Sequence, residues 1–415
     1  MKHLIIGCGT AAFSALKEIR NITSEGEVKL VTMEEYFPYS PAALPYLISK
    51  RIREEDLWLG DASYFEKMKA SLVRNKEVVS LSPQTREVTY KDGRQEEYDT
   101  LLISCGADPT WPPIKGLDSV EALGFHTLAD YEKLAKQLDG KKDVAIYGGG
   151  LVALEMATAL LESGYQVKII VRSRLLRRLF DKGVSGLIED IFRQHGAHIY
   201  KGGEINEVKQ KGNKIEILLS TGDSLSAELL ISNLGVRPRI AFLKGSGIRV
   251  NSGVLVDKKM RTNIPNVYAA GDVAEGPDFF SGQPGLNAIS PNAIEQGKVA
   301  GANMAGQETE SNGWIAMNIL KFLGHSAFAI GLNAAEVDST KYQVFKQEDN
   351  RDKCYKELVF QGNKLVGARF FDVEIDPGTI RYLIEARVDI IDDKALLFNR
   401  PVEVSRKLML EAERK

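Results

Sequence analysis

Two short glycine-rich segments have the spacing that a chain needs to hold a phosphate. The first comprises residues 7–12, which read GCGTAA, between an apolar run at residues 2–6 and a helical pattern. In such a strand, turn and helix, Gly7 permits the tight turn, Gly9 lets the backbone approach a pyrophosphate, and Ala12 lets helix and strand pack closely. The free amides at the start of the helix then face the negative charge.

The same pattern occurs a second time farther along the chain. An apolar run at residues 143–147 is followed by Gly148, Gly150 and Ala153 at the same spacing and by a helical pattern that ends near Gly164. One such turn can also be a glycine turn without a ligand, but two copies in one chain are far more specific. The sequence therefore predicts two Rossmann-like, three-layer α/β domains, each of which binds a dinucleotide.

The composition limits the other kinds of chemistry. At 415 residues the chain is long enough for about two to four compact units. Its net charge of −2 gives no attraction to nucleic acid, and no apolar run reaches the roughly 18 residues of a membrane span. Cys8, Cys105 and Cys354 are too few and too far apart for a disulfide framework or an iron–sulfur cluster, and the first two fit as packing residues. We expect a cytoplasmic protein without a metal site, whose redox chemistry, if any, needs an organic cofactor.

Three further segments resemble one known group of proteins. Residues 101–109 (LLISCGADP) and 233–238 (NLGVRP) look like crossovers between two dinucleotide domains, and residues 262–274 (TNIPNVYAAGDVA) look like a strand that leads into a Gly-Asp turn. With the two glycine-rich turns, they make most of the chain similar to the pyridine nucleotide-dependent flavoproteins, which include glutathione reductase-like enzymes, NADH oxidases, coenzyme A-disulfide reductases and ferredoxin or rubredoxin reductases. The resemblance implies FAD in the first site, NAD(P)H in the second and a C-terminal α+β interface domain. The implied boundaries are 1–112 with 236–308 for the FAD domain, 113–235 for the NAD(P) domain and 309–415 for the interface domain.

The resemblance also implies which residues bind the two cofactors. An aspartate in the place of Asp272 accepts a hydrogen bond from the flavin chain in this family, and the helix that contains Gln296 lies beneath the flavin ring. A glutamate in the place of Glu155 lies beside the nicotinamide. The residues implied for FAD are Gly7, Gly9, Ala12, Glu34, Gly106, Gly271, Asp272 and Gln296. The residues implied for NAD(P)H are Gly148, Gly150, Ala153, Glu155, Arg172, Arg178 and Gly235.

The chain departs from the family pattern at two positions near the FAD site. Relatives end the second strand with a glutamate that binds the adenosine ribose, but Met33 has that place here, and Glu34 is either a shifted ribose ligand or a solvated carboxylate. Residues 36–46 (YFPYSPAALPY) resemble the segment in which coenzyme A-disulfide reductases carry a cysteine beside the flavin, and Ala42 has its position. Because alanine can be neither nucleophile nor sulfenic acid, a thiol mechanism loses its central atom.

The end of the strand at residues 166–171 bears on the choice between NADH and NADPH. NADH enzymes usually carry an acid there that binds the ribose hydroxyls, but Val171 has that position and arginines follow at 172, 174, 177 and 178. Guanidinium groups suit a 2′-phosphate, and Arg172 and Arg178 match the arginine pair of NADPH-using relatives. We expect NADPH, with a basic solvated turn as the alternative.

The chain beyond about residue 313 reads as a small α+β domain. Its predicted elements are strands at 327–331, 355–360 and 364–370, the last two joined by a hairpin turn, and helices at 377–388 and 399–415, the last on the surface. In relatives this domain forms a homodimer or docks a partner protein, and the sequence leaves both open. His325 has a position from which some relatives lend a residue to the flavin, although most single histidines are not catalytic.

These features together imply hydride transfer from nicotinamide C4 to flavin N5 without a cysteine relay. We expect an FAD-dependent NAD(P)H oxidoreductase that passes electrons to an iron–sulfur or metal-containing partner protein or subunit. An NAD(P)H oxidase that reduces oxygen is one alternative, and rapid peroxide formation would favour it. A non-catalytic redox sensor that resembles apoptosis-inducing factor is the other, and slow turnover with every acceptor would favour that.

Overall fold

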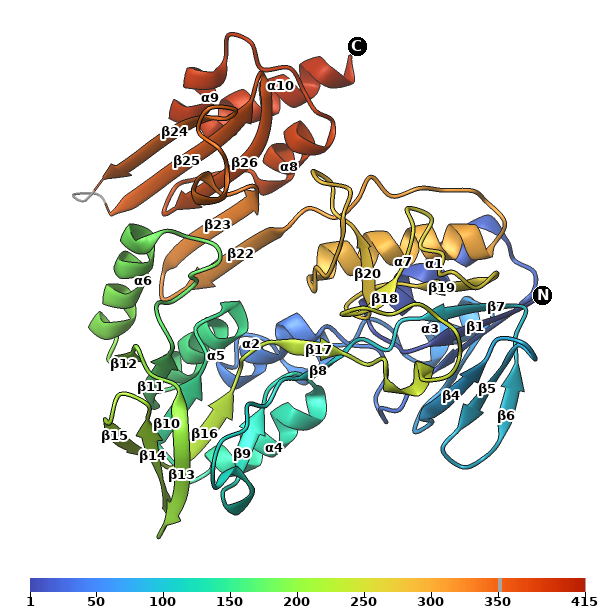
Figure 1. Ribbon diagram of the computed structural model, residues 1–415, viewed down its shortest axis with the longest axis horizontal. Helices are drawn as coiled ribbons and strands as arrows, with labels where there is room; N and C mark the ends of the chain where they lie inside the picture. The colour runs from blue at the N-terminus through green and yellow to red at the C-terminus, as the bar shows by residue number, and fades with distance from the viewer. Residues whose placement is uncertain (350–352, 415) are drawn as a thin grey trace. The chain divides into compact units, whose positions relative to one another are not determined.

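The computed structural model describes residues 1–349 and 353–414, which form two compact units (Figure 1). One unit combines residues 1–109 with 236–315, and the other combines 110–235 with the described residues from 316 onward. The C-terminal segment thus shares a unit with the expected NAD(P) domain, and the three-domain division stays a prediction. In the described part of the chain, no helix has the length and apolar character needed to cross a membrane.

The first unit is built around a parallel sheet. Its strand order is β19 (Val267–Ala269), β7 (Thr100–Ile103), β1 (Lys2–Ile6), β2 (Glu27–Val31) and β3 (Ala70–Val73). Ile5 lies in register with Leu30 and Leu102, and all three side chains are fully buried. Such continuous apolar strands form where both faces of a parallel sheet are covered.

Two helices of this unit pack unusually closely. Helices α1 (Thr10–Ile22) and α7 (Ser290–Met304) meet where a Cβ atom at Gly297 would lie 2.2 Å from the carbonyl oxygen of Ala11, and one at Gly301 would lie 2.6 Å from that of Ala15. Glycine is therefore required at both contacts. Figure 1 shows the two helices, in blue and gold, beside each other.

Smaller elements complete the first unit. They are α2 (Leu44–Ile48), α3 (Ala62–Lys67), the antiparallel sheet β4 (Val78–Ser82), β5 (Glu87–Tyr90) and β6 (Gln95–Glu97), the ribbon β8 (Ala107–Pro109) and β17 (Val236–Pro238), the sheet β18 (Val254–Leu255), β20 (Ala274–Pro277) and β21 (Pro284–Gly285), and the 3-10 helices η1 (Pro41–Ala43), η2 (Glu54–Asp56) and η4 (Ala241–Leu243). The ribbon β8–β17 pairs the two expected crossovers with each other, and Arg239 holds it through an ion pair with Asp108 at 2.5 Å.

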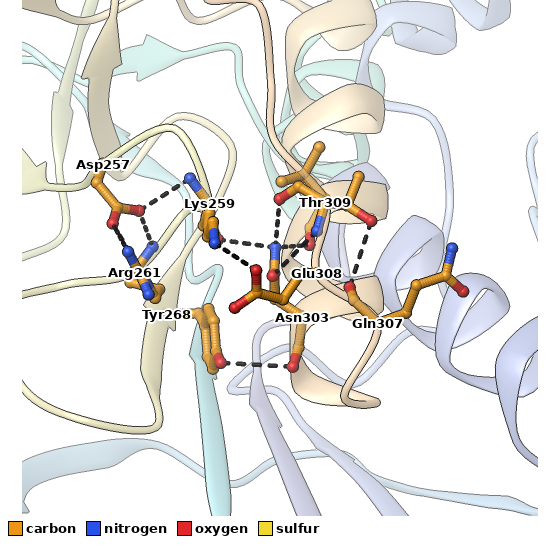
Figure 2. A network of polar contacts seen from close by, with 9 residues as sticks. Asp257, Lys259, Arg261, Tyr268, Asn303, Gln307, Glu308 and Thr309 are labelled. Atoms are coloured by element: carbon orange, nitrogen blue, oxygen red, sulfur yellow. Dashed lines mark hydrogen bonds and ion pairs between the residues drawn. The ribbon is translucent and has the colours of Figure 1, made fainter.

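A polar network fixes the carboxyl end of α7 (Figure 2). The Asn303 amide donates to the carbonyl oxygens of Lys259, at 3.2 Å, and Thr309, at 2.8 Å. The Lys259 ammonium also bonds the Glu308 carboxylate at 2.8 Å. Because the segment that contains Lys259 leads into β19, this network sets the position of α7 relative to the turn that follows β19.

The second unit repeats the architecture of the first. Its parallel sheet has the order β12 (His198–Lys201), β11 (Gln166–Val171), β10 (Asp143–Tyr147), β16 (Leu229–Ser232) and β9 (Ala122–Gly124). Ile146 lies in register with Ile169 and Ile231, all fully buried. The accompanying elements are η3 (Leu117–Ser119), α4 (Leu128–Leu138), α5 (Leu151–Glu162), α6 (Lys182–Gln194) and the antiparallel sheet β13 (Ile205–Lys211), β14 (Lys214–Leu219) and β15 (Ser224–Ala227). The predicted pair of Rossmann-like α/β folds is confirmed.

The C-terminal part of the second unit is an antiparallel sheet with helices. The strand order is β22 (Met317–Phe322), β23 (His325–Gly331), β26 (Lys364–Phe371), β25 (Cys354–Gln361) and β24 (Gln343–Asp349), with η5 (Ala334–Glu336), α8 (Pro377–Glu385), α9 (Lys394–Asn399) and α10 (Pro401–Glu413). The predicted hairpin joins β25 to β26. The tail helix, expected on the surface, instead buries Val404 and Leu408, and its Ser405 hydroxyl shares a hydrogen bond with Thr379 of α8 at 2.6 Å.

One buried arginine ties this sheet to the rest of the unit. Arg369 of β26 is 4% exposed and donates to the carbonyl oxygens of Leu179, at 3.1 Å, and Leu332, at 2.5 Å. The carboxylate of Glu357, also buried, lies 3.8 Å from the guanidinium. Since Leu179 belongs to the segment between β11 and α6, the C-terminal sheet and the NAD(P)-type fold are linked through these bonds.

Candidate dinucleotide-binding sites

The first glycine-rich turn has the shape expected for a phosphate cradle. Gly7 has a φ of 110°, and a Cβ atom there would lie 2.2 Å from the carbonyl oxygen of Ser104, which follows β7. Gly9 is exposed, has an ordinary φ of −79° and would direct a Cβ into open space. Gly9 also begins helix α1, whose first amides receive no side-chain cap. Ala12 is fully buried in the first turn of that helix.

The second turn has the same construction. Gly148 has a φ of 143°, and a Cβ atom there would lie 2.3 Å from the carbonyl oxygen of Asn233, which follows β16. Gly150 is exposed, faces open space and begins α5 without a side-chain cap. Ala153 is buried beneath it. In both turns, uncapped helix amides beside an unfilled space fit a pyrophosphate, because these amides and the helix dipole both attract an anion.

The Gly-Asp turn lies beside the first cradle. Ala270 donates to the carbonyl oxygen of Ile103 at 3.0 Å, which places the turn at the carboxyl edge of β7. A Cβ atom at Gly271 would lie 3.1 Å from the Cβ of Ala11 in α1. The structure therefore brings Asp272, which is half-buried, to the amino end of α1. The expected role of Asp272 as a ligand of the flavin chain stays a prediction.

Gln296 of α7 contacts the Gly-Asp turn. Its side chain is 3% exposed, and its amide oxygen accepts a hydrogen bond from the Gly271 amide at 2.8 Å. It thus holds the Gly-Asp turn in place. Contact of Gln296 with FAD stays a prediction, although its amide oxygen already accepts the bond from Gly271. Gly106, the remaining glycine expected at this site, has a φ of 70° and accepts from the Arg239 amide at 3.1 Å.

Glu34 lies close to the first turn. Tyr39 donates to its carboxylate at 2.8 Å, and the negative charge of Glu34 contributes to the raised pKa of Cys8. Met33, at the position usual for the ribose ligand, is 50% exposed. A role for Glu34 as a shifted ribose ligand stays a prediction. Sequence reasoning did not single out Tyr39, which lies five residues away in an aromatic-rich segment.

The thiols near this site are held protonated. Burial, aided by Glu34, raises the pKa of Cys8 to about 12. Burial likewise raises the pKa of Cys105 to about 12, and its sulfur donates to the carbonyl oxygen of Arg239 at 3.3 Å. Ala42, in the 3-10 helix η1, is exposed, and its side chain is only a methyl group. Neither Cys8 nor Cys105 can take over as a thiolate nucleophile at neutral pH.

The arginines after β11 are not equivalent. Arg174 donates to the carbonyl oxygens of Arg177, at 3.1 Å, and Phe180, at 3.2 Å, so it shapes its own loop. Arg172 bonds the carboxylate of Glu204 at 3.1 Å. Arg178 is exposed and bonds no residue within the described part of the chain. Sequence reasoning missed Glu204, since no motif connects it with β11.

Glu155 and Gly235, both expected to contact NAD(P)H, lie in the second unit. Glu155, in α5, is half-buried, and burial raises the pKa of its carboxyl to about 7. Among the described residues, none donates a hydrogen bond to it, so the carboxyl remains available to a ligand. Gly235 has a φ of 102° and accepts from the Thr110 amide at 2.9 Å, within the crossover.

His325 lies at the start of β23, in the C-terminal sheet of the second unit. Its Nδ1 lies 2.5 Å from the Asp372 carboxylate, whose other oxygen accepts from the Ser326 amide. The ring stacks on Phe371 with an interplanar angle of 9°. These contacts account for the histidine within its own sheet, and a role toward flavin stays a prediction.

Comparisons with known proteins agree with this geometry. A family model described as pyridine nucleotide-disulphide oxidoreductase matches residues 1–308. The chain is 31% identical over 417 residues to the NADH-dependent phenylglyoxylate dehydrogenase subunit epsilon of Aromatoleum evansii, covering 100% of this chain and 98% of the other. It is 30% identical to an NAD(P)H sulfur oxidoreductase (CoA-dependent) of Pyrococcus abyssi, covering 90% and 88%. The water-forming NADH oxidase of Lactobacillus brevis, solved with NADH, superposes with a TM-score of 0.88 at 22% identity, covering 100% and 98%, which supports the fold.

Proposed function

The chain belongs to the pyridine nucleotide-disulphide oxidoreductase family, and from this premise we propose that it is the flavin subunit of an electron-transfer complex. It is an NAD(P)H-dependent oxidoreductase. In the proposed reaction it oxidises NADH or NADPH and passes electrons to an iron–sulfur or metal-containing partner protein. A relative that aligns over its whole length is named as a subunit of an NADH-dependent dehydrogenase, which supports this assignment.

The observation that carries the proposal is the alanine at position 42. Members that reduce disulfides or sulfur compounds need a thiolate beside the flavin, and Ala42 removes it. Cys8 and Cys105 do not replace it, because burial keeps both thiols protonated. Without a thiol relay, electrons pass directly to an external acceptor.

We propose that the first unit holds FAD. The turn at Gly7 and Gly9, with the amino end of α1, would bind its pyrophosphate, Glu34 its adenosine ribose and Asp272 its flavin chain. Gln296 would act by keeping the Gly271 turn in place. Bound FAD supplies hydride acceptance and the release of electrons singly or in pairs. The protein contributes alignment and electrostatic stabilisation.

We propose that the second unit holds the nicotinamide dinucleotide. Gly148, Gly150 and the amino end of α5 would bind its pyrophosphate, and Glu155 would orient the carboxamide. The sequence favours NADPH through Arg172 and Arg178, whereas the relative named NADH-dependent favours NADH. We propose that both are substrates and that residues around Arg172 set their ratio.

We also propose that the protein is cytoplasmic and that it assembles with a partner subunit or with a second copy of itself. Three free cysteines fit a reducing compartment, which supports the cytoplasm. In this proposal, the C-terminal sheet and helices would contact a partner subunit or a second copy of the chain.

The test begins with the purified chain. We expect a flavin absorbance spectrum that bleaches under anaerobic NADH or NADPH, fast reduction of a one-electron acceptor such as ferricyanide, and slow peroxide formation. Activity should survive iodoacetamide because no thiolate takes part. Affinity purification from the native source should recover an iron-containing subunit. A colourless protein that leaves both dinucleotides untouched would refute the proposal, and oxygen consumption as fast as ferricyanide reduction would favour the oxidase.

A further inference from the structure

The loop that follows β12 returns to the end of β11. The Gly202 amide donates to the carbonyl oxygen of Val171, the last residue of β11, at 3.1 Å. Two residues later, the Glu204 backbone makes two hydrogen bonds with Ser220, whose hydroxyl accepts from the Glu204 amide at 3.0 Å and whose amide donates to the Glu204 carbonyl oxygen at 2.8 Å. The next amide, that of Ile205, donates to the Tyr147 hydroxyl at 3.4 Å. Glu204 is therefore fixed at the carboxyl edge of the parallel sheet.

This edge is where the adenosine ribose of a dinucleotide lies in a Rossmann-like fold. Val171, at the position usual for an acidic ribose ligand, cannot bind hydroxyl groups. The Glu204 carboxylate lies 3.1 Å from the Arg172 guanidinium, and both side chains face solvent, with 53% and 60% of their surface exposed. A carboxylate thus comes to this edge from a neighbouring loop, although the strand itself provides none.

The ion pair of Glu204 and Arg172 makes the carboxyl edge of the sheet favour a ribose with free hydroxyls over one with a 2′-phosphate. A carboxylate accepts hydrogen bonds from ribose hydroxyls but repels a 2′-phosphate, and here it also takes one N–H and offsets part of the positive charge of the Arg172 guanidinium. Arg174 does not compensate, because its guanidinium bonds the carbonyl oxygens of Arg177 and Phe180. Lys201, at the end of β12, is likewise engaged, with its ammonium 2.6 Å from the Glu189 carboxylate.

We propose that Glu204 is a specificity-determining residue that disfavours the 2′-phosphate of NADPH and accepts the ribose hydroxyls of NADH. The inference rests on the proposed function of the second unit as a dinucleotide site. It modifies the interpretation of Arg172 as a 2′-phosphate ligand, because one N–H of its guanidinium bonds Glu204, while the exposed Arg178 carries no such bond to any described residue.

The test compares Glu204→Gln with the wild type. Glutamine keeps a hydrogen-bonding oxygen and removes the charge. We expect the ratio of kcat/KM for NADPH to that for NADH to rise about tenfold, the effect of removing one nearby charge at an exposed site. Calorimetry with 2′,5′-ADP and 5′-AMP, which carry no nicotinamide, should show the same shift in relative affinity. In the double variant Glu204→Gln/Arg172→Gln, the gain should disappear.

Glu216→Gln is the matched control. Glu216 is an exposed carboxylate on β14 of the same unit that pairs with Lys211 at 2.7 Å, so its replacement removes the same charge from a surface ion pair. This variant should leave both ratios unchanged. Unchanged ratios in Glu204→Gln, or equal changes in the control, would overturn the inference. Failure of both adenosine fragments to bind the wild type would instead count against the proposed dinucleotide site.

Discussion

Replacing the two glycines of the second turn by alanine, one at a time, should have different effects. Gly148→Ala should lower the stability of the fold, and Gly150→Ala should weaken dinucleotide binding. Gly148 has a φ of 143°, and its Cβ would meet the Asn233 carbonyl oxygen at 2.3 Å. Gly150 has an ordinary φ of −88°, and apart from its chain neighbours no atom of the described residues lies within 4 Å of a Cβ placed there. One substitution therefore strains the fold, whereas the other fills only the space assigned to the pyrophosphate.

The two magnitudes follow from this geometry. Gly148→Ala combines unfavourable backbone strain of about 1–3 kcal/mol with a steric overlap, so we expect a loss of about 3 kcal/mol in the free energy of unfolding. That loss corresponds to a fall in Tm of about 6–12 °C for a unit of this size. Gly150→Ala should cost less than about 1 kcal/mol in stability. It should nevertheless weaken NAD(P)H binding by at least about tenfold, or about 1.4 kcal/mol.

Thermal unfolding followed by circular dichroism and calorimetric titration with NADH and NADPH measure the two effects. The flavin absorbance of Gly150→Ala should match that of the wild type, because the first turn is untouched. Undiminished dinucleotide binding by Gly150→Ala would show that the open space is not the phosphate site. A Gly148→Ala protein as stable as the wild type would refute the backbone argument.

Three other changes test buried and titratable groups. Arg369→Met removes the positive charge beside the buried Glu357 carboxylate and should cost about 3–5 kcal/mol in urea unfolding, with part recovered by adding Glu357→Gln. Burial raises the pKa of Glu155 to about 7, so the free energy of unfolding of the wild type should fall by at most about 3 kcal/mol as pH rises from about 4.5 to 7. Glu155→Gln should not show this fall. Parallel pH profiles of unfolding for the two proteins would refute this. Cys8 and Cys105, each with a pKa near 12, should react with iodoacetamide at pH 7.5 far more slowly than free cysteine, as mass spectrometry would show.

Local patterns in the sequence were sufficient to predict the two glycine-rich turns. The spacing of Gly7, Gly9 and Ala12, and its repetition at Gly148, predicts strand, turn and helix because each position imposes a backbone or packing requirement within a few residues. The structure has both turns, with uncapped helices behind them. The antiparallel pairing of β8 with β17, which lie in the two predicted crossovers, came from the structure.

The sequence by itself determined the α/β class, the two turns and the absence of a cysteine at position 42. Only the tertiary structure decided that Gln296 holds Gly271, that Glu204 pairs with Arg172, and that the tail helix is packed against α8. The physical reason is the range of the interactions. A turn or helix start depends on neighbours in the chain, whereas parallel strands bring the loops of distant segments to one edge, and no spacing in the sequence records which side chains meet there.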